Sequence, residues 1–309
     1  MIRALLLDLG GTLVRESDRT LFPHVRPALR TIAGFETADG SPLEWCLASN
    51  FPAQVPVPPA QAAAAVRQVV GILERADLAD LFQPADRRVM ISAVVGVAKP
   101  NRAFFEGALT RLGLPPTLAT CLFISEDADH VARAAALGMH TLRFGGHTSP
   151  PDATADFTDW AEAPAMVAAR LAPGPTPAMT AAVRVFLETA LGLSVSAVTP
   201  PAGDGDPFRA DARTPSPLSD PALGELAGVH VSLPVRPAVW VSPAGRVTRV
   251  EGTDPSAADL AEATLYVQSL ASNGRVEAVA GESPLGPTHA VETDAQGLRT
   301  LTRKRFTAY

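Results

Sequence analysis

Three residues with chemically useful side chains, Asp8, Ser49 and Glu126, each stand just past the end of a short apolar run. A carboxylate can bind a hard cation, and a hydroxyl can donate a hydrogen bond to an oxyanion. Each residue also has a purely structural explanation. Asp8 can hold a turn, Ser49 can form a turn or cap a helix, and Glu126 can oppose the dipole at a helix N-terminus. Which explanation applies depends on whether the fold brings the three together.

Short apolar runs alternate with helical patterns through the first half of the chain. The predicted strands lie at residues 2–7, 43–48, 89–92, 121–124 and 140–144, and the predicted helices at 25–32, 60–76, 103–112 and 130–137. Strands that are buried on both faces read as continuous apolar runs, so this order predicts an α/β domain with βαβ units and a Rossmann-like parallel sheet. Ligands of such sheets bind beyond the carboxyl ends of the strands. Asp8, Ser49 and Glu126 are therefore expected to meet in one crevice.

A Pro-rich segment at 173–177 predicts a linker between two domains, because its prolines remove backbone donors and fix φ. The first domain would cover residues 1–172 and the second, smaller domain residues 178–309. The segment 199–221 is dominated by Pro, Gly, Asp and Ser and is expected to be a mobile loop.

The second domain shows an α+β pattern with antiparallel strands. Helices are predicted at 178–191 and 255–272, strands at 229–233, 239–241, 247–250 and 276–279, and a hairpin at 289–292 and 298–306. Asp254 is the predicted N-cap of the later helix. The role of this domain is open, and it could contact a protein partner or a second copy of the chain.

Composition excludes several classes of partner. The chain has 309 residues, of which 47% are apolar, and a formal charge of -6. Binding to nucleic acid needs clustered Lys and Arg that displace counterions, so this charge argues against it. No apolar stretch approaches the roughly 20 residues that cross a bilayer. We therefore expect a soluble, cytoplasmic protein without a membrane partner, in which Cys46 and Cys121 are core thiols.

Four separated segments carry a common pattern. They are Asp8-Leu9-Gly10-Gly11-Thr12-Leu13, then Leu47-Ala48-Ser49-Asn50, then Gly96-Val97-Ala98-Lys99-Pro100 followed by Phe104, and finally Leu122-Phe123-Ile124-Ser125-Glu126-Asp127, which runs into Ala136-Leu137-Gly138-Met139. In this order they resemble the haloacid dehalogenase (HAD) superfamily over residues 1–150. The resemblance implies a HAD-type sheet. The short spacings from Gly11 to Ser49 and from Ser49 to Lys99 indicate a capless domain.

The resemblance also implies catalytic roles. Asp8 is the expected nucleophile, which forms an aspartyl intermediate. Ser49 is expected to donate a hydrogen bond to the transferring phosphoryl group. Lys99 is expected to hold the nucleophile and the phosphate charge, whereas a Lys considered alone is usually a solvated surface residue.

Substrate and metal contacts are implied in the same way. A small phosphorylated molecule or another anion is the expected ligand, and the residues expected to bind it are Gly11, Thr12 and Asn50. Mg²⁺ is the expected cofactor. Its expected ligands are Asp8, the backbone carbonyl of Gly10, Glu126 and Asp127.

Two residues depart from the family pattern. Gly10 stands where the family has a second Asp that acts as general acid and base, and Ser125 stands where it has an Asp metal ligand. A single acid-base residue contributes about a hundred-fold to ten-thousand-fold in rate. His24 could enter the crevice instead, and His130, which replaces a family Asn, could be a ligand or a surface residue.

Two hypotheses about function follow. The first is a HAD-like hydrolase, phosphatase-like and impaired by the loss of the acid-base residue. The second is a degenerate HAD domain, a pseudoenzyme that serves as a binding or regulatory protein.

Overall fold

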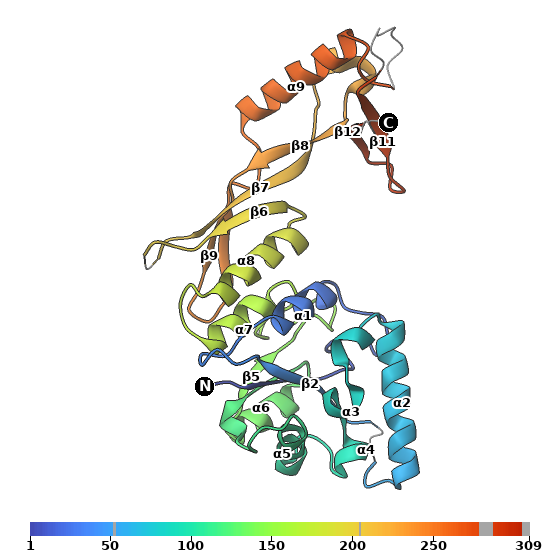
Figure 1. Ribbon diagram of the computed structural model, residues 1–309, viewed down its shortest axis with the longest axis vertical. Helices are drawn as coiled ribbons and strands as arrows, with labels where there is room; N and C mark the ends of the chain where they lie inside the picture. The colour runs from blue at the N-terminus through green and yellow to red at the C-terminus, as the bar shows by residue number, and fades with distance from the viewer. Residues whose placement is uncertain (52–53, 204, 278–286, 305–309) are drawn as a thin grey trace, which may run out of the picture. The chain divides into compact units, whose positions relative to one another are not determined.

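The computed structural model describes residues 1–51, 54–203, 205–277 and 287–304 (Figure 1). The chain divides into two compact units. Unit 1 comprises Met1–Ala190 and Val241–Val247, and unit 2 comprises Leu191–Trp240 and Thr248–Tyr309. No helix in the described part of the chain is both long and apolar enough to cross a membrane.

A five-stranded parallel sheet forms the centre of unit 1, with strand order β3-β2-β1-β4-β5. Its strands are β1 (Ala4–Leu7), β2 (Glu44–Ser49), β3 (Val89–Ile91), β4 (Cys121–Ser125) and β5 (His140–Arg143). All five lie where continuous apolar runs predicted them, because β1, β3 and β4 are buried along their whole length. The predicted α/β class and Rossmann-like parallel sheet are confirmed.

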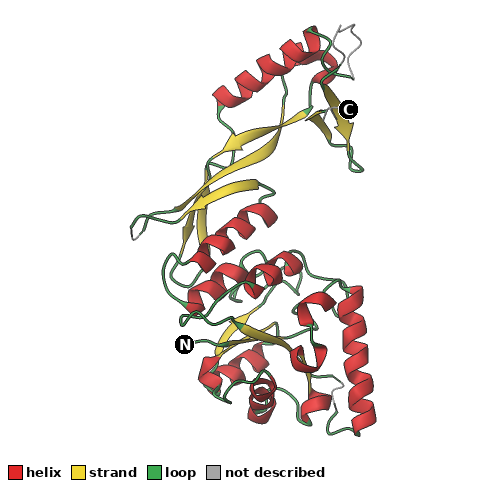
Figure 2. Ribbon diagram, in the orientation of Figure 1, coloured by secondary structure: helices red, strands yellow, loops and turns green. Residues whose placement is uncertain are grey.

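Helices cover both faces of this sheet (Figure 2). The helices of unit 1 are α1 (Val25–Ala33), α2 (Pro59–Arg75), α3 (Ala85–Arg88), α4 (Ser92–Val95), α5 (Arg102–Arg111), α6 (Ala128–Ala136), α7 (Ala163–Leu171) and α8 (Pro177–Thr189), with short 3₁₀ turns η1 (Ala79–Phe82) and η2 (Leu118–Thr120). Figure 1 shows α5 and α6 on one side of the sheet and α1 and α7 on the other. Between β1 and β2 and between β2 and β3, the described residues form only loops and these helices, without an inserted cap domain.

The core between the sheet and α5 fixes the segment that precedes this helix. Asn101 caps α5 by accepting a hydrogen bond from the backbone N–H of Ala103. Phe104 and Phe105 are fully buried in a cluster that includes Leu6. The Phe105 ring lies 5.4 Å from that of Phe123, in an edge-on arrangement. The chain just before residue 101 is thereby held close to the carboxyl end of the sheet.

Residues 173–175 of the predicted linker form bends between α7 and α8, and its last two residues cap and start α8. Thr176 caps α8 by accepting a hydrogen bond from the N–H of Met179, and Pro177 takes the first helical position, where its missing N–H costs nothing. The helix contacts α1 and α7. Unit 1 therefore extends to Ala190 rather than ending near residue 172.

Unit 2 contains a seven-stranded sheet with order β10-β9-β7-β8-β12-β11, and β6 also pairs with β7. Its elements are β6 (Ser194–Thr199), β7 (Phe208–Pro217), η3 (Pro221–Leu226), β8 (His230–Val235), β9 (Ala238–Val241), β10 (Val247–Glu251), α9 (Ala257–Ser272), β11 (His289–Thr293) and β12 (Arg299–Arg303). The pairs of β7 with β6, β8 and β9 are antiparallel, whereas β12 runs parallel to β8. The predicted α+β unit with antiparallel strands is confirmed.

Two predictions in this half are wrong. The segment 199–221 contains the ten-residue strand β7 rather than a mobile loop. Its buried positions alternate, but short side chains such as Ala210 and Ala212 gave little apolar pattern beside its prolines. The later helix is capped by Ser256 in a capping box with Asp259, and not by Asp254. The predicted strand 276–279 and hairpin segment 298–306 extend partly outside the described residues.

We expect Gly245→Ala to destabilise unit 1 by more than the roughly 1–2 kcal/mol that a left-handed backbone costs a residue with a Cβ. Gly245 has φ +83°, and a Cβ there would lie 2.3 Å from the carbonyl oxygen of Ala165 in α7. Gly113→Ala is the control, since Gly113 has φ +77° and no atom within 4 Å of the added Cβ. Urea unfolding followed by Trp fluorescence measures both. Equal losses in the two variants would contradict the close contact with α7.

Candidate active site

The register of the sheet places Asp8 and Ser125 at the same level. Leu7 in β1 pairs with Leu47 in β2 and with Ile124 in β4. The residues that follow Leu7 and Ile124 are Asp8 and Ser125, so both leave the sheet at its carboxyl edge. Central position in the sheet gives Asp8 neighbours on both sides.

Asp8 is held by three donors. The Nζ of Lys99 lies 2.5 Å from its Oδ2, and the hydroxyl of Ser125 donates a 2.9 Å hydrogen bond to the same oxygen. The backbone N–H of Leu9 donates to Oδ1 at 2.8 Å. Only 9% of the Asp8 side chain and 1% of the Lys99 side chain are exposed. The carboxylate and the ammonium thus form a buried ion pair with fixed orientation.

Lys99 is positioned through its backbone by Asn50. The amide oxygen of Asn50 accepts from the N–H of Lys99 at 2.7 Å, and the amide nitrogen donates to the carbonyl of Lys99 at 3.1 Å. The ammonium also lies 5.3 Å from the centre of the Phe123 ring. The Nζ of Lys99 pairs with the Asp8 carboxylate at 2.5 Å, and its charge also acts on Glu126.

Glu126 forms the second half of the cluster. Its backbone N–H donates to the hydroxyl of Thr12 at 2.9 Å, and that hydroxyl donates back to the Oε2 of Glu126 in a very short hydrogen bond. The Oγ of Ser125 lies 3.2 Å from the same oxygen. Thr12 is itself fixed, because the indole N–H of Trp160 donates to its carbonyl at 2.9 Å. Segments 148 residues apart in sequence therefore meet at Thr12.

The proximity of two carboxylates changes the protonation of Glu126. Burial is the main cause that raises the pKa of Glu126, and the negative charge of Asp8 raises it further. The Thr12 hydroxyl and Lys99 oppose this shift without cancelling it. Ser125 has a single hydroxyl proton to share between the two carboxylates. The cluster consequently holds more negative charge than its own donors neutralise.

Gly11 permits this close arrangement. It has φ +70°, and a Cβ at this position would lie 2.8 Å from the Cγ of Glu126. Only glycine gives both the left-handed backbone and the space. Position 10 does not require glycine in the same way. The φ of Gly10 is not left-handed, and the nearest atoms to a Cβ at this position would lie 3.5 Å away.

The donor set fits a hard cation in part. Within the described residues, no group of three or more His, Cys, Asp or Glu side chains is placed to hold a metal ion. Mg²⁺ does not need such a group, since proteins often bind it through one or two carboxylates while water and substrate phosphate complete its shell. Asp8 and Glu126 are both within 3.2 Å of the Ser125 hydroxyl, close enough for one ion to reach both. The backbone carbonyl of Gly10 belongs to the loop that follows Asp8.

Asp127, which the sequence predicted as a metal ligand, acts as a helix cap in the structure. Its Oδ1 caps α6 by accepting hydrogen bonds from the N–H groups of Asp129 and His130. Burial raises the pKa of Asp127, but these backbone hydrogen bonds and the His130 charge lower it by more, so the net shift is downward. One carboxylate oxygen of Asp127 is therefore used to cap α6.

The other predicted residues fall into two groups. Ser49 is buried at the end of β2, on the same edge as Asp8, and Gly11 lines the adjacent pocket. Asn50 and Thr12, predicted to bind substrate, use their side chains to position Lys99 and Glu126. The Nδ1 of His24 lies 2.7 Å from Asp159, which lines that pocket, whereas His24 itself does not line it.

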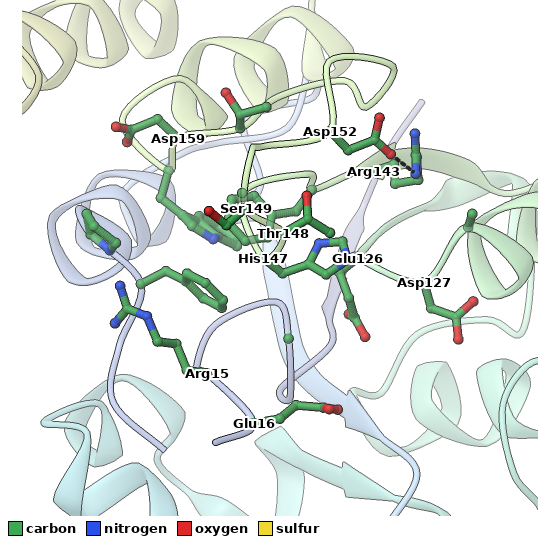
Figure 3. A pocket seen from close by; sticks show the side chains of 18 of the residues that line it. Arg15, Glu16, Glu126, Asp127, Arg143, His147, Thr148, Ser149, Asp152 and Asp159 are labelled. Atoms are coloured by element: carbon green, nitrogen blue, oxygen red, sulfur yellow. Dashed lines mark ion pairs between the residues drawn. The ribbon is translucent and has the colours of Figure 1, made fainter. Parts of the chain in front are cut away.

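A pocket of about 850 Å³ opens beside the cluster (Figure 3). Gly11 and Glu126 join it to the cluster, whereas Asp8, Ser49 and Lys99 do not line it. Arg15 and Glu16 come from the loop after β1, and on another wall Arg143 pairs with Asp152 at 2.7 Å. This pocket has the size of an ordinary small-molecule site.

Sequence reasoning missed three contributors to this region. Ser125 was identified only as a lost metal ligand, although a hydroxyl between two carboxylates is a useful donor. Trp160 lies beyond the four motifs and carried no pattern of its own. Glu16 stands in an aperiodic loop, where spacing does not reveal which side chains return to the site.

Several solved structures that are similar to part of this chain are HAD-family proteins. No family model and no curated protein matches the chain. Solved structures that match include a HAD family hydrolase from Deinococcus radiodurans with bound phosphate and sodium, at 16% identity over 54% of this chain and 95% of that one, with a TM-score of 0.39. L-2-haloacid dehalogenase from Xanthobacter autotrophicus matches at 16% identity over 48% of this chain and 80% of that one, with a TM-score of 0.34.

A HAD family enzyme from Bacteroides thetaiotaomicron, in complex with magnesium and inorganic phosphate, matches at 13% identity over 50% of this chain and 98% of that one, with a TM-score of 0.23. The matching structures are thus HAD-family proteins, as the sequence motifs predicted. At these identities and TM-scores the similarity carries no argument about the chemistry of this chain, which rests on its own geometry.

We expect Glu126→Gln to stabilise the metal-free protein at neutral pH. Because the folded-state pKa of Glu126 is raised above its ordinary value of 4.5, the folded state retains the proton more strongly than the unfolded state. Stability from this group is full below about pH 4.5 and is lost as pH rises through the folded-state pKa. The difference between variant and wild type should therefore grow from pH 4.5 toward 7 in urea-unfolding measurements.

Glu74→Gln, at an exposed position of α2, is the matched control and should follow the wild-type profile. A Glu126→Gln profile parallel to wild type over this range would show that the carboxylate is not crowded by Asp8.

Proposed function

We propose that unit 1 is a HAD-like hydrolase that cleaves phosphoesters through a covalent intermediate on Asp8. One observation carries the proposal: Lys99 and Asp8 form a buried ion pair at the carboxyl edge of a parallel sheet. Burying two charges is costly, and apolar residues often serve stability as well. The pair has a functional explanation if Asp8 is a nucleophile and Lys99 is the cation that attracts an anionic substrate.

The contacts of Asp8 indicate which oxygen reacts. Oδ2 is engaged by Lys99 and Ser125, while Oδ1 accepts one hydrogen bond, from Leu9. In this mechanism Oδ1 attacks phosphorus, and the bond to the leaving oxygen breaks. Lys99 places its positive charge beside this carboxylate and would donate hydrogen bonds to the phosphoryl oxygens. Ser49, at the end of the adjacent strand, would donate a further hydrogen bond.

Mg²⁺ is part of the proposal. Asp8, Glu126 and the backbone carbonyl of Gly10 would hold it, and when bound it supplies positive charge that polarises the phosphoryl group. Burial, the main cause of the raised pKa of Glu126, and the charge of Asp8 both disfavour the ionised form of Glu126, which a bound cation would favour. Ser125 in place of a third carboxylate would make binding weaker than a carboxylate-rich site.

A second candidate is displacement of a leaving group from carbon, by attack of Asp8 without a metal. It is favoured by the contacts of Ser125 and Lys99, which together satisfy Oδ2 of Asp8 with side chains alone. The two reactions are distinguished by a chelator. Turnover of phosphoesters should fall when Mg²⁺ is removed, whereas halide release by the second mechanism should not.

We expect beryllofluoride with Mg²⁺ to raise the Tm of the wild type and to leave the Tm of Asp8→Asn unchanged. Beryllofluoride mimics a phosphoryl group only when a carboxylate oxygen completes its tetrahedron, and Asn lacks that anionic oxygen. Differential scanning fluorimetry with and without fluoride measures the shift. An equal Tm shift in both proteins would contradict the placement of Asp8 in the phosphate site.

We expect Ser125→Asp to be less stable than the wild type without metal and to gain more Tm from Mg²⁺. A third carboxylate beside Asp8 and Glu126 increases repulsion, which a bound cation relieves, and a ligand that binds more tightly stabilises the folded protein more. Ser125→Ala is the control and should gain no more than the wild type. A Tm that does not change with Mg²⁺ in any of the three proteins would contradict the metal assignment.

A further inference from the structure

The space left by Gly10 is filled by another carboxylate. A Cβ built on Gly10 would lie 3.5 Å from the Oε1 of Glu16 and 3.8 Å from its Cγ. The guanidinium of Arg19 approaches the same point, also at 3.5 Å. An Asp side chain at position 10 would extend from that Cβ into the space that Glu16 and Arg19 now border.

We infer that Glu16 is the general acid and base of the proposed hydrolysis, supplying from the loop the carboxylate that position 10 lacks. This inference rests on the proposed function and adds to it the residue that moves the protons. His24 is not available for the task because it interacts with Asp159.

Backbone hydrogen bonds within the loop after β1 fix the position of Glu16. Isolated bridges join Gly10 to Val14 and Val14 to Leu21. The N–H of Arg15 donates to the carbonyl of Thr20 at 2.8 Å, and the N–H of Arg19 donates back to the carbonyl of Arg15 at 3.0 Å. The chain is thus folded back on itself.

The pocket gives independent support. Glu16 lines it together with Gly11 and Glu126 (Figure 3). A ligand that lies beside Gly11 and Glu126 would therefore meet the Glu16 carboxylate as well. Glu16 is exposed, so its side chain is free to turn toward the oxygen that leaves, and such contacts often tighten only when substrate is bound.

The proton transfers balance in two steps. In the first, the Glu16 carboxylic acid gives its proton to the leaving oxygen as the bond between that oxygen and phosphorus breaks, and an alcohol departs. In the second, the Glu16 carboxylate takes a proton from water as the water oxygen bonds to phosphorus and the bond to Asp8 breaks. Inorganic phosphate leaves, and Glu16 is protonated for the next cycle.

The test compares two phosphate monoesters, an aryl phosphate with an acidic leaving group and an alkyl phosphate with a basic one. We expect Glu16→Gln to lower kcat/KM for the alkyl ester by about a hundred-fold or more, the usual contribution of a general acid. The aryl ester needs less protonation, so its loss should be smaller. The alkaline limb of the pH profile should also change. Glu74→Gln, on the exposed face of α2, should match the wild type.

Gly10→Asp in the Glu16→Gln background provides the second variant. The φ of Gly10 is not left-handed, and the nearest atoms to an added Cβ are in flexible side chains at 3.5 Å, so the added side chain can be accommodated, and we expect it to restore most of the lost rate. The inference is overturned if Glu16→Gln matches the wild type on both esters while Asp8→Asn is inactive, a result that leaves the proposed function standing. If wild type and Asp8→Asn hydrolyse the esters equally, the proposed function fails and this inference fails with it.

Discussion

The buried ion pair between Lys99 and Asp8 is the interaction on which the rest of unit 1 is organised. Removing two charges from water is expensive, and a single misplaced partner leaves an unpaired charge in the interior. The chain therefore fixes both ends. Asp8 is fixed by its place at the end of the central strand, and Lys99 by Asn50 and by the buried face of α5 that follows it. The geometry of the site is a consequence of keeping this pair together.

A second constraint is the excess of negative charge beside that pair. Glu126 is drawn against Asp8 by Thr12 and by a glycine that alone allows the approach. The cluster contains two carboxylates and one ammonium, so its charges do not balance without a further cation. The Ser125 hydroxyl separates the carboxylates and reduces the charge that a third acid would add. This arrangement is consistent with a site that binds Mg²⁺ weakly and gains its full charge balance only with ligands present.

The sequence predicted the sheet of unit 1 well because its strands are buried on both faces, and Asp8, Ser49 and Glu126 do end at one edge. It predicted the partners of these residues less well. Asn50 and Asp127 carry oxygen atoms that could bind a ligand, but in the structure these atoms accept hydrogen bonds from backbone N–H groups. The type of side chain alone does not distinguish these two uses. Helix α8 was predicted at 178–191, but strand β7 was missed where Pro, Gly, Asp and Ser suggested a mobile loop, since a Pro near the end of a strand breaks no interaction. Glu16 returns to Gly10 through the tertiary path of a loop, which has no periodicity to reveal it.

The central claim is that Asp8 becomes covalently bonded to phosphorus. Its most direct test is to quench the protein with acid during turnover of a phosphoester in Mg²⁺ and to map the peptides by mass. The account predicts a phosphoryl group on the peptide that contains Asp8 in the wild type, and none on the same peptide of Asp8→Asn. Hydrolysis that proceeds with this peptide unmodified at every quench time would contradict it.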